Sequence, residues 1–175
     1  MTARDVRVFE TGSGGDLQYN GQDLEGAVSF ENFPYMAMFG GNPASITSEK
    51  TEGEESFDFW GNELLWSGNP DIQFNSRTEK VLSEVSLNSS GRKSIEEAVK
   101  ADLSFMGAFS DITVSVELPS LDTVKINILI QEPDNGVEQR FTYIWDGARL
   151  IDDTKTVINK PTIAIGLQGG LQYNL

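Results

Sequence analysis

Hydrophobic and polar residues alternate with a period of two in three runs of the chain between residues 112 and 145. This period is typical of strands that bury one face and expose the other. The apolar positions of the first two runs are Ile112, Val114, Val116 and Leu118, and then Val124, Ile126, Ile128 and Ile130. The third run places on one face Val137, Gln139, Phe141, Tyr143 and Trp145. Turn signals at 119–122 and 133–136 join the runs and predict a three-stranded antiparallel meander.

Two helical patterns precede these runs. The first is predicted at about residues 76–87, where Ser76 and Glu79 have the spacing of a capping box. The second is predicted at about residues 94–106, where Ser94 and Glu97 repeat that spacing. Its apolar stripe is formed by Ile95, Ala98, Val99, Leu103 and Met106.

The predicted fold class is therefore α+β, with two short helices packed on a three-stranded antiparallel meander and with extended, β-rich N- and C-terminal arms. The predicted α+β core spans residues 71–147. An N-terminal arm and aromatic-rich segment, 1–70, precedes the core, and an extended C-terminal arm, 148–175, follows it.

The aromatic-rich stretch 26–41 contains Pro34, which argues against a helix interior, so two short extended pieces are predicted there. Its aromatic side chains either cover the core or face a partner. The Gly-Gly-Asp-Leu-Gln-Tyr-Asn run that ends at Asn20 resembles the run that ends at Asn174. This echo is either a chance match between glycine-rich ends or a sign that both arms make similar strand-addition contacts.

Large apolar side chains of the two arms are the predicted protein-interface residues. They are Phe33, Tyr35, Phe39, Phe59, Trp60, Trp66, Ile163, Ile165, Leu167 and Tyr173.

The net charge of the chain is −14, from 27 acidic and 13 basic residues among 175. Such a charge repels phosphate groups, so we expect neither nucleic acid nor an anionic membrane surface as a partner. A basic protein partner is compatible with the charge, although solubility alone also explains it. No run reaches the roughly 18 apolar residues of a membrane helix and no signal peptide is visible, so we expect a soluble protein that is made in the cytoplasm.

The absence of cysteine and histidine narrows the kinds of catalytic and metal-binding site that the chain can form. Disulfides, thiol catalysis and a Ser-His-Asp triad are excluded, and a zinc site lacks its usual ligands. A carboxylate pair could hydrolyse glycosides without histidine, but most acidic residues fall on predicted loops or outer helix faces. No calcium-loop or phosphate-loop pattern occurs. We therefore predict no catalytic, cofactor-binding or metal-binding residue.

An ordered series of short motifs resembles the small baseplate wedge proteins of contractile-tailed phages, of the Mu and T-even types. The series begins with Gly15-Asp16-Leu17 and continues with Glu25, Ala27 and Val28. It then has an aromatic-Gly-Asn step, Phe59-Trp60-Gly61-Asn62, and Arg77 at the start of the helix pair. It ends with the strand motif of Ile112, Val114 and Val116. The Glu-Pro-Arg triplet of some T-even-type relatives is absent.

This resemblance implies a structural subunit of the virion, without catalytic activity or cofactor, that is assembled in the host cytoplasm. Its implied partners are other baseplate wedge proteins, the tail sheath and hub proteins, and it would be present in several copies. It would join the wedge proteins around the hub and help the first sheath ring to assemble. Two alternatives from other classes are a carboxylate-dependent cell-wall hydrolase, since some relatives carry a lysozyme-like label, and an acidic protein-binding module.

Overall fold

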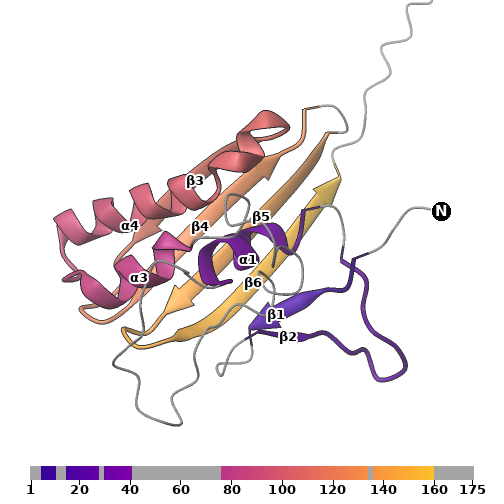
Figure 1. Cartoon of the computed structure of the whole chain (residues 1–175), viewed down its shortest axis with the longest axis horizontal. Helices are drawn as coiled ribbons and strands as arrows, with labels where there is room; N and C mark the ends of the chain where they lie inside the picture. Colours follow the sequence, from indigo (N-terminus) through magenta and orange to yellow (C-terminus); the bar gives the residue numbers. More distant parts are fainter. Residues whose placement is uncertain (1–4, 11–14, 28–29, 41–75, 134–135, 160–175) are drawn as a thin grey trace, which may run out of the picture.

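A four-stranded antiparallel sheet is the element on which the described chain is assembled (Figure 1). The computed structural model describes residues 5–10, 15–27, 30–40, 76–133 and 136–159. The strands neighbour one another in chain order: β3 (Asp111–Glu117), β4 (Val124–Gln131), β5 (Val137–Trp145) and β6 (Leu150–Asn159). A separate two-stranded hairpin consists of β1 (Val8–Glu10) and β2 (Gly15–Leu17).

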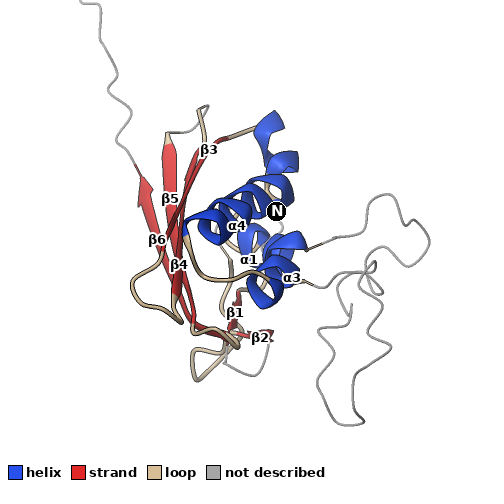
Figure 2. Cartoon of the chain, turned by 90° about the vertical axis from the view of Figure 1, so that its left-hand side faces the viewer, coloured by secondary structure: helices blue, strands red, loops and turns tan. Residues whose placement is uncertain are grey.

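The helices of the described chain gather on one face of the sheet (Figure 2). They are α1 (Phe33–Phe39), α3 (Arg77–Glu84), α4 (Ser89–Asp102) and the 3-10 helix η2 (Ser104–Ala108). The core lies between the two layers, because the even positions of β3 and β4 and the odd positions of β5 are turned toward the helices. Cross-strand register brings Val114, Ile128 and Phe141 side by side there. The broad α+β class predicted from the sequence is confirmed.

The predicted three-stranded meander is incomplete: β3, β4 and β5 pair in the predicted order, and β6 adds a fourth strand paired along β5. Residues 150–159 belong to the predicted C-terminal arm, 148–175, whose apolar residues suggest only short extended pieces. β6 lies at an edge of the sheet. Thr154, Thr156 and Ile158 are exposed on its outer face, and positions on that face do not need apolar residues. Leu150 is buried in the core.

The prediction of extended structure around Pro34 is wrong, because α1 is a helix. Pro34 lies in the first turn of α1, where a backbone N–H has no partner within the helix and the fixed φ of proline suits the start. Met36 N–H bonds to the carbonyl of Asn32 instead, so the proline does not interrupt the helix.

Both helices predicted between 76 and 106 exist, but neither begins with the expected cap. Ser76 makes no capping bond to α3 and donates its hydroxyl to the Ala37 carbonyl at 2.9 Å. Helix α4 begins at Ser89, five residues before Ser94, because the Asn88 side chain accepts hydrogen bonds from the N–H groups of Ser90 and Gly91.

The N-terminal segment is packed onto the sheet through hydrogen bonds as well as apolar contacts. The Asn32 side chain accepts from Val8 N–H at 3.0 Å and donates to the Val6 carbonyl at 2.7 Å. From β6, the Lys155 ammonium donates to the Val8 carbonyl at 2.7 Å, which places β1 beside β6 (Figure 1). The hydrophobic core consequently extends beyond the predicted limits of 71–147 on both sides, and includes Val8, Tyr35, Met38, Phe39 and Leu150.

Candidate functional site: an exposed phenylalanine patch

Four phenylalanine rings from two separate segments meet on the helical side of the molecule, and we call them the phenylalanine patch. They are Phe30, Phe33, Phe105 and Phe109. The ring centroids of Phe30 and Phe109 lie 5.0 Å apart, those of Phe30 and Phe33 5.4 Å, and those of Phe33 and Phe105 6.1 Å. Phe105 and Phe109 are each 44% exposed, which is high for aromatic side chains that already contact other rings.

The patch follows from the way η2 ends the helical hairpin. Leu103 and Met106 point into the core and are almost completely buried. The Met106 carbonyl also accepts hydrogen bonds from the N–H and hydroxyl groups of Ser110, and these bonds hold the turn into β3. With that face of the turn fixed inward, Phe105 and Phe109 are displayed outward against Phe30 and Phe33. Such a surface can bind an apolar partner but carries no group that transfers a proton.

Of the ten interface residues predicted from the sequence, three lie in the described part of the chain. Phe33 belongs to the phenylalanine patch. Tyr35 and Phe39 are buried, with ring centroids 5.8 Å apart and with Phe39 5.9 Å from Tyr143, so they pack on the core as the alternative interpretation had it. The other seven lie outside the described residues: Phe59, Trp60, Trp66, Ile163, Ile165, Leu167 and Tyr173.

Phe30, Phe105 and Phe109 were not among the predicted interface residues. A signal for two of them is present in the sequence, since Phe105 and Phe109 are four apart and flank Met106, an inward position of the stripe. Phe109 contacts Phe30 and Phe105 contacts Phe33, across 79 and 72 positions of the chain, and no local pattern predicts such contacts.

Three carboxylates with perturbed pKa values, Asp102, Asp122 and Asp146, stabilise turns and helix ends. Hydrogen bonding from the Ser120 and Thr123 hydroxyls lowers the pKa of Asp122, and bonds from the N–H groups of Arg149 and Ala148 lower the pKa of Asp146. Burial raises the pKa of Asp102, although its carboxylate accepts hydrogen bonds at the start of α3. Each carboxylate has local partners, so none resembles an acid held ready for proton transfer.

Two buried carboxylates near the β4–β5 turn lie on opposite faces of the sheet. Glu132 accepts a hydrogen bond from the core-facing amide of Gln139 at 3.1 Å, whereas Glu138 pairs with Arg140 on the outer face. They cannot flank one glycosidic bond. Among the described residues there is also no group of three acidic side chains placed to hold a metal ion. No described helix is long and apolar enough to cross a membrane.

No protein-family model, curated protein or solved structure gives a significant match to this chain.

Proposed function

We propose that this protein is a structural wedge component of the baseplate of a contractile phage tail, and that it acts without catalysis or cofactor. The observation that carries the proposal is the ordered series of motifs from Gly15-Asp16-Leu17 to Ile112, Val114 and Val116. In this role the protein binds other wedge proteins around the hub and helps the first sheath ring to assemble, in several copies per virion.

The phenylalanine patch supports an adaptor role. Its residues lie in or beside η2 and α1, whose inner faces are fixed by the core, so its geometry is set before a partner arrives. Aromatic side chains, phenylalanine among them, are enriched at protein interfaces. The strong negative charge is compatible with wedge proteins and sheath as binding partners, and it disfavours the binding of nucleic acid and of anionic membranes.

The arms contribute further contacts in the proposal. Residues 160–175 follow β6 and contain the predicted interface residues Ile163, Ile165, Leu167 and Tyr173. Because β6 is part of the sheet, a deletion that tests the arm begins at residue 160 and not at residue 148.

Co-expression with the other wedge proteins and the sheath protein tests the function. We expect a stable complex by size-exclusion chromatography with light scattering, weakened by deletion of 160–175 and by the double substitution Phe105→Ser and Phe109→Ser. Leu121→Ser is the matched control, because Leu121 is 92% exposed and lies outside the patch. A full-length protein that stays monomeric beside every tail protein would contradict the proposal, as would clearing of a peptidoglycan suspension by the purified chain.

A further inference from the structure

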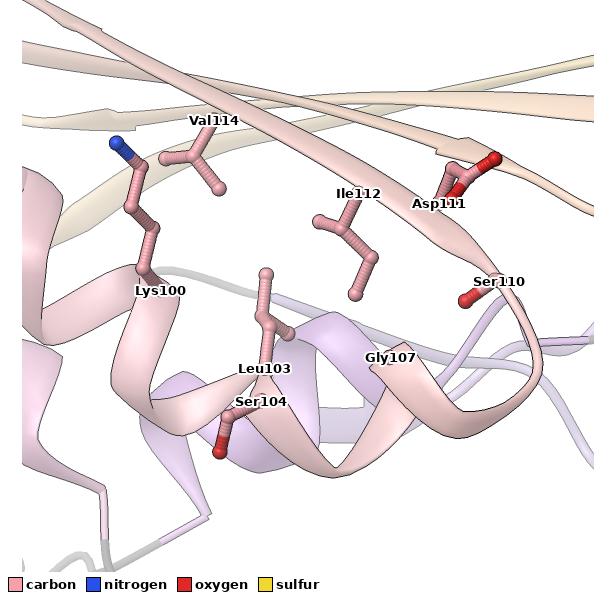
Figure 3. Close-up of a pocket in the computed structure, with 8 residues that line it drawn as sticks. All are labelled: Lys100, Leu103, Ser104, Gly107, Ser110, Asp111, Ile112 and Val114. Atoms are coloured by element: carbon pink, nitrogen blue, oxygen red, sulfur yellow. The ribbon is translucent and has the colours of Figure 1, made fainter.

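A groove of about 350 Å³ lies between α4, η2 and the edge strand β3 (Figure 3). Its apolar floor is formed by the side chains of Leu103, Ile112 and Val114, with Leu103 and Ile112 pointing toward each other. Lys100 stands at one end and Asp111 at the other. Gly107 lines the wall, and a Cβ atom added there would meet nothing within 4 Å. The groove is thus apolar at its floor and open beside Gly107.

The backbone groups of β3 that border this groove face away from the sheet. Glu132, the residue after β4, donates its N–H to the Val137 carbonyl of β5. Hydrogen-bonded pairs recur at every second residue of an antiparallel pair, so the even positions of β4 bond to β5 and the odd positions of β4 bond to β3. The odd positions of β3 pair with them, as Thr113 does with Leu129. The N–H and C=O groups of Ile112 and Val114 therefore point to the free edge, and no described bond from outside the sheet reaches them.

Arg92 closes the far end of this edge. Its guanidinium donates to the Val116 carbonyl at 3.4 Å, which agrees with the outward direction of the even positions. An added strand can therefore pair beside residues 111–115 but not beside Val116. Ile112 and Val114 therefore have free backbone groups at the edge and also contribute their side chains to the apolar floor of the groove.

The geometry points to a peptide-docking site, and we propose that the groove binds an extended segment of a different protein by strand addition to β3. In this arrangement, partner residues opposite Ile112 and Val114 place their side chains on the helical side of the sheet, over the floor of the groove. The partner residue opposite Asp111 lies on the outer face beside that carboxylate.

Charge determines which segment fits. Asp111 is exposed and has no ion pair within the described chain, whereas Lys100 is already paired with Glu96 at 2.6 Å. Strand β3 contains two acidic residues and no basic one, and the whole chain carries a charge of −14. A second copy of this chain would meet like charge. The occupant is therefore a segment with alternate apolar residues and a Lys or Arg opposite Asp111. This site does not depend on the proposed baseplate role.

A fluorescein-labelled peptide, Gly-Thr-Leu-Thr-Val-Lys-Gly, is the probe. Aligned antiparallel to β3, it sets Leu opposite Val114, Val opposite Ile112 and Lys opposite Asp111. Fluorescence anisotropy is expected to give saturable binding with a Kd of about 0.1 mM or tighter. Gly107→Leu adds a branched side chain to the lining of the groove and is expected to weaken binding about tenfold or more. Ala108→Leu is the matched control, because Ala108 is exposed on the same turn but does not line the groove, and it is expected to leave the Kd unchanged.

Charge reversal distinguishes specific binding at this site from non-specific binding of peptides. We expect Asp111→Lys to lose the lysine peptide and to gain a peptide with Glu in place of Lys. Circular dichroism melting confirms that each variant is folded. Failure of the peptide to bind would overturn the docking site, as would equal binding by Gly107→Leu or equal binding of the glutamate peptide to the natural chain. Tighter binding of a peptide with the sequence of residues 161–168 would overturn the stated occupant and assign the groove to a copy of this chain.

Discussion

The carboxylate of Asp102, the last residue of α4, caps the first turn of α3 by accepting hydrogen bonds from the N–H and hydroxyl groups of Thr78, at 2.8 and 2.7 Å. The Arg77 N–H donates to the same carboxylate at 3.0 Å. The start of one helix is thus held by the end of the next, and the two helices cannot separate without leaving N–H groups unbonded.

Replacing Asp102 with alanine is expected to lower the free energy of unfolding by about 1–2 kcal/mol, the usual cost of losing a helix cap. Urea denaturation at neutral pH measures this. Glu97→Ala is the control, because Glu97 is an exposed acidic residue of the same helix. Equal losses for both variants would show that Asp102 is not a cap.

The pH dependence of Asp102 has a defined sign. Burial raises its pKa above the usual 3.8, so the folded state binds more protons than the unfolded state between 3.8 and the raised value. The stability contributed by this shift is fully present below pH 3.8 and is lost as the pH rises through the folded pKa. The natural chain, compared with Asp102→Asn, should therefore gain relative stability on acidification. A constant difference in unfolding free energy across this range would contradict the assignment.

Glu96 should behave in the opposite way. Hydrogen bonding from Lys100, followed by the charges of Lys100 and Arg92, lowers its pKa below the usual 4.5. Its contribution is present above pH 4.5 and is lost as the pH falls through the folded pKa. The advantage of the natural chain over Glu96→Gln should shrink on acidification and should also shrink with added salt. Denaturation curves at several pH values and at several salt concentrations measure the two effects.

Asn32→Ala should weaken the attachment of the N-terminal segment to the sheet. The N–H group of Val8, a buried residue, would lose its partner, and such a loss costs about 1–3 kcal/mol. Asn127→Ala is the matched control, since Asn127 bonds to Glu117 on the outer face of the sheet. Thermal unfolding should show a clearly larger drop for Asn32→Ala. Equal melting temperatures would mean that β1 adds nothing to the fold.

Two glycines on the helical layer should differ sharply in their tolerance of alanine. A Cβ atom at Gly91 would collide with the Ser86 carbonyl oxygen, whereas one at Gly107 has open space. Gly91→Ala is expected to cost about 1–3 kcal/mol despite the higher helix propensity of alanine. Gly107→Ala should change stability by less than about 0.5 kcal/mol. Chemical denaturation of the two variants compares them directly.

The sequence predicted those parts of the fold in which local pattern and packing agree. Strands β3, β4 and β5 were found because each buries one face, and α3 because its stripe faces the core. β6 was missed because an edge strand needs few apolar residues. α1 was missed because the effect of Pro34 depends on its position in the helix, which composition does not reveal.

The phenylalanine patch and the groove beside β3 were less predictable from the sequence than the helices and strands. Tyr35 and Phe39 had the right chemistry for an interface, but tertiary packing buries them. The contact of Phe30 with Phe109 and the groove beside Asp111 each depend on how η2 turns into β3. Neither follows from any periodicity in the chain.

The parity of the β3 hydrogen bonds should be visible residue by residue in solution. Amide protons of Thr113 and Ser115 are bound to β4 and should exchange with deuterium only when the sheet opens. Amide protons of Ile112 and Val114 point to the free edge of the sheet and should exchange at rates close to those of unprotected amides. An NMR exchange series should therefore show slow and fast amides alternating along a single strand, with the fast ones slowing when a peptide occupies the edge.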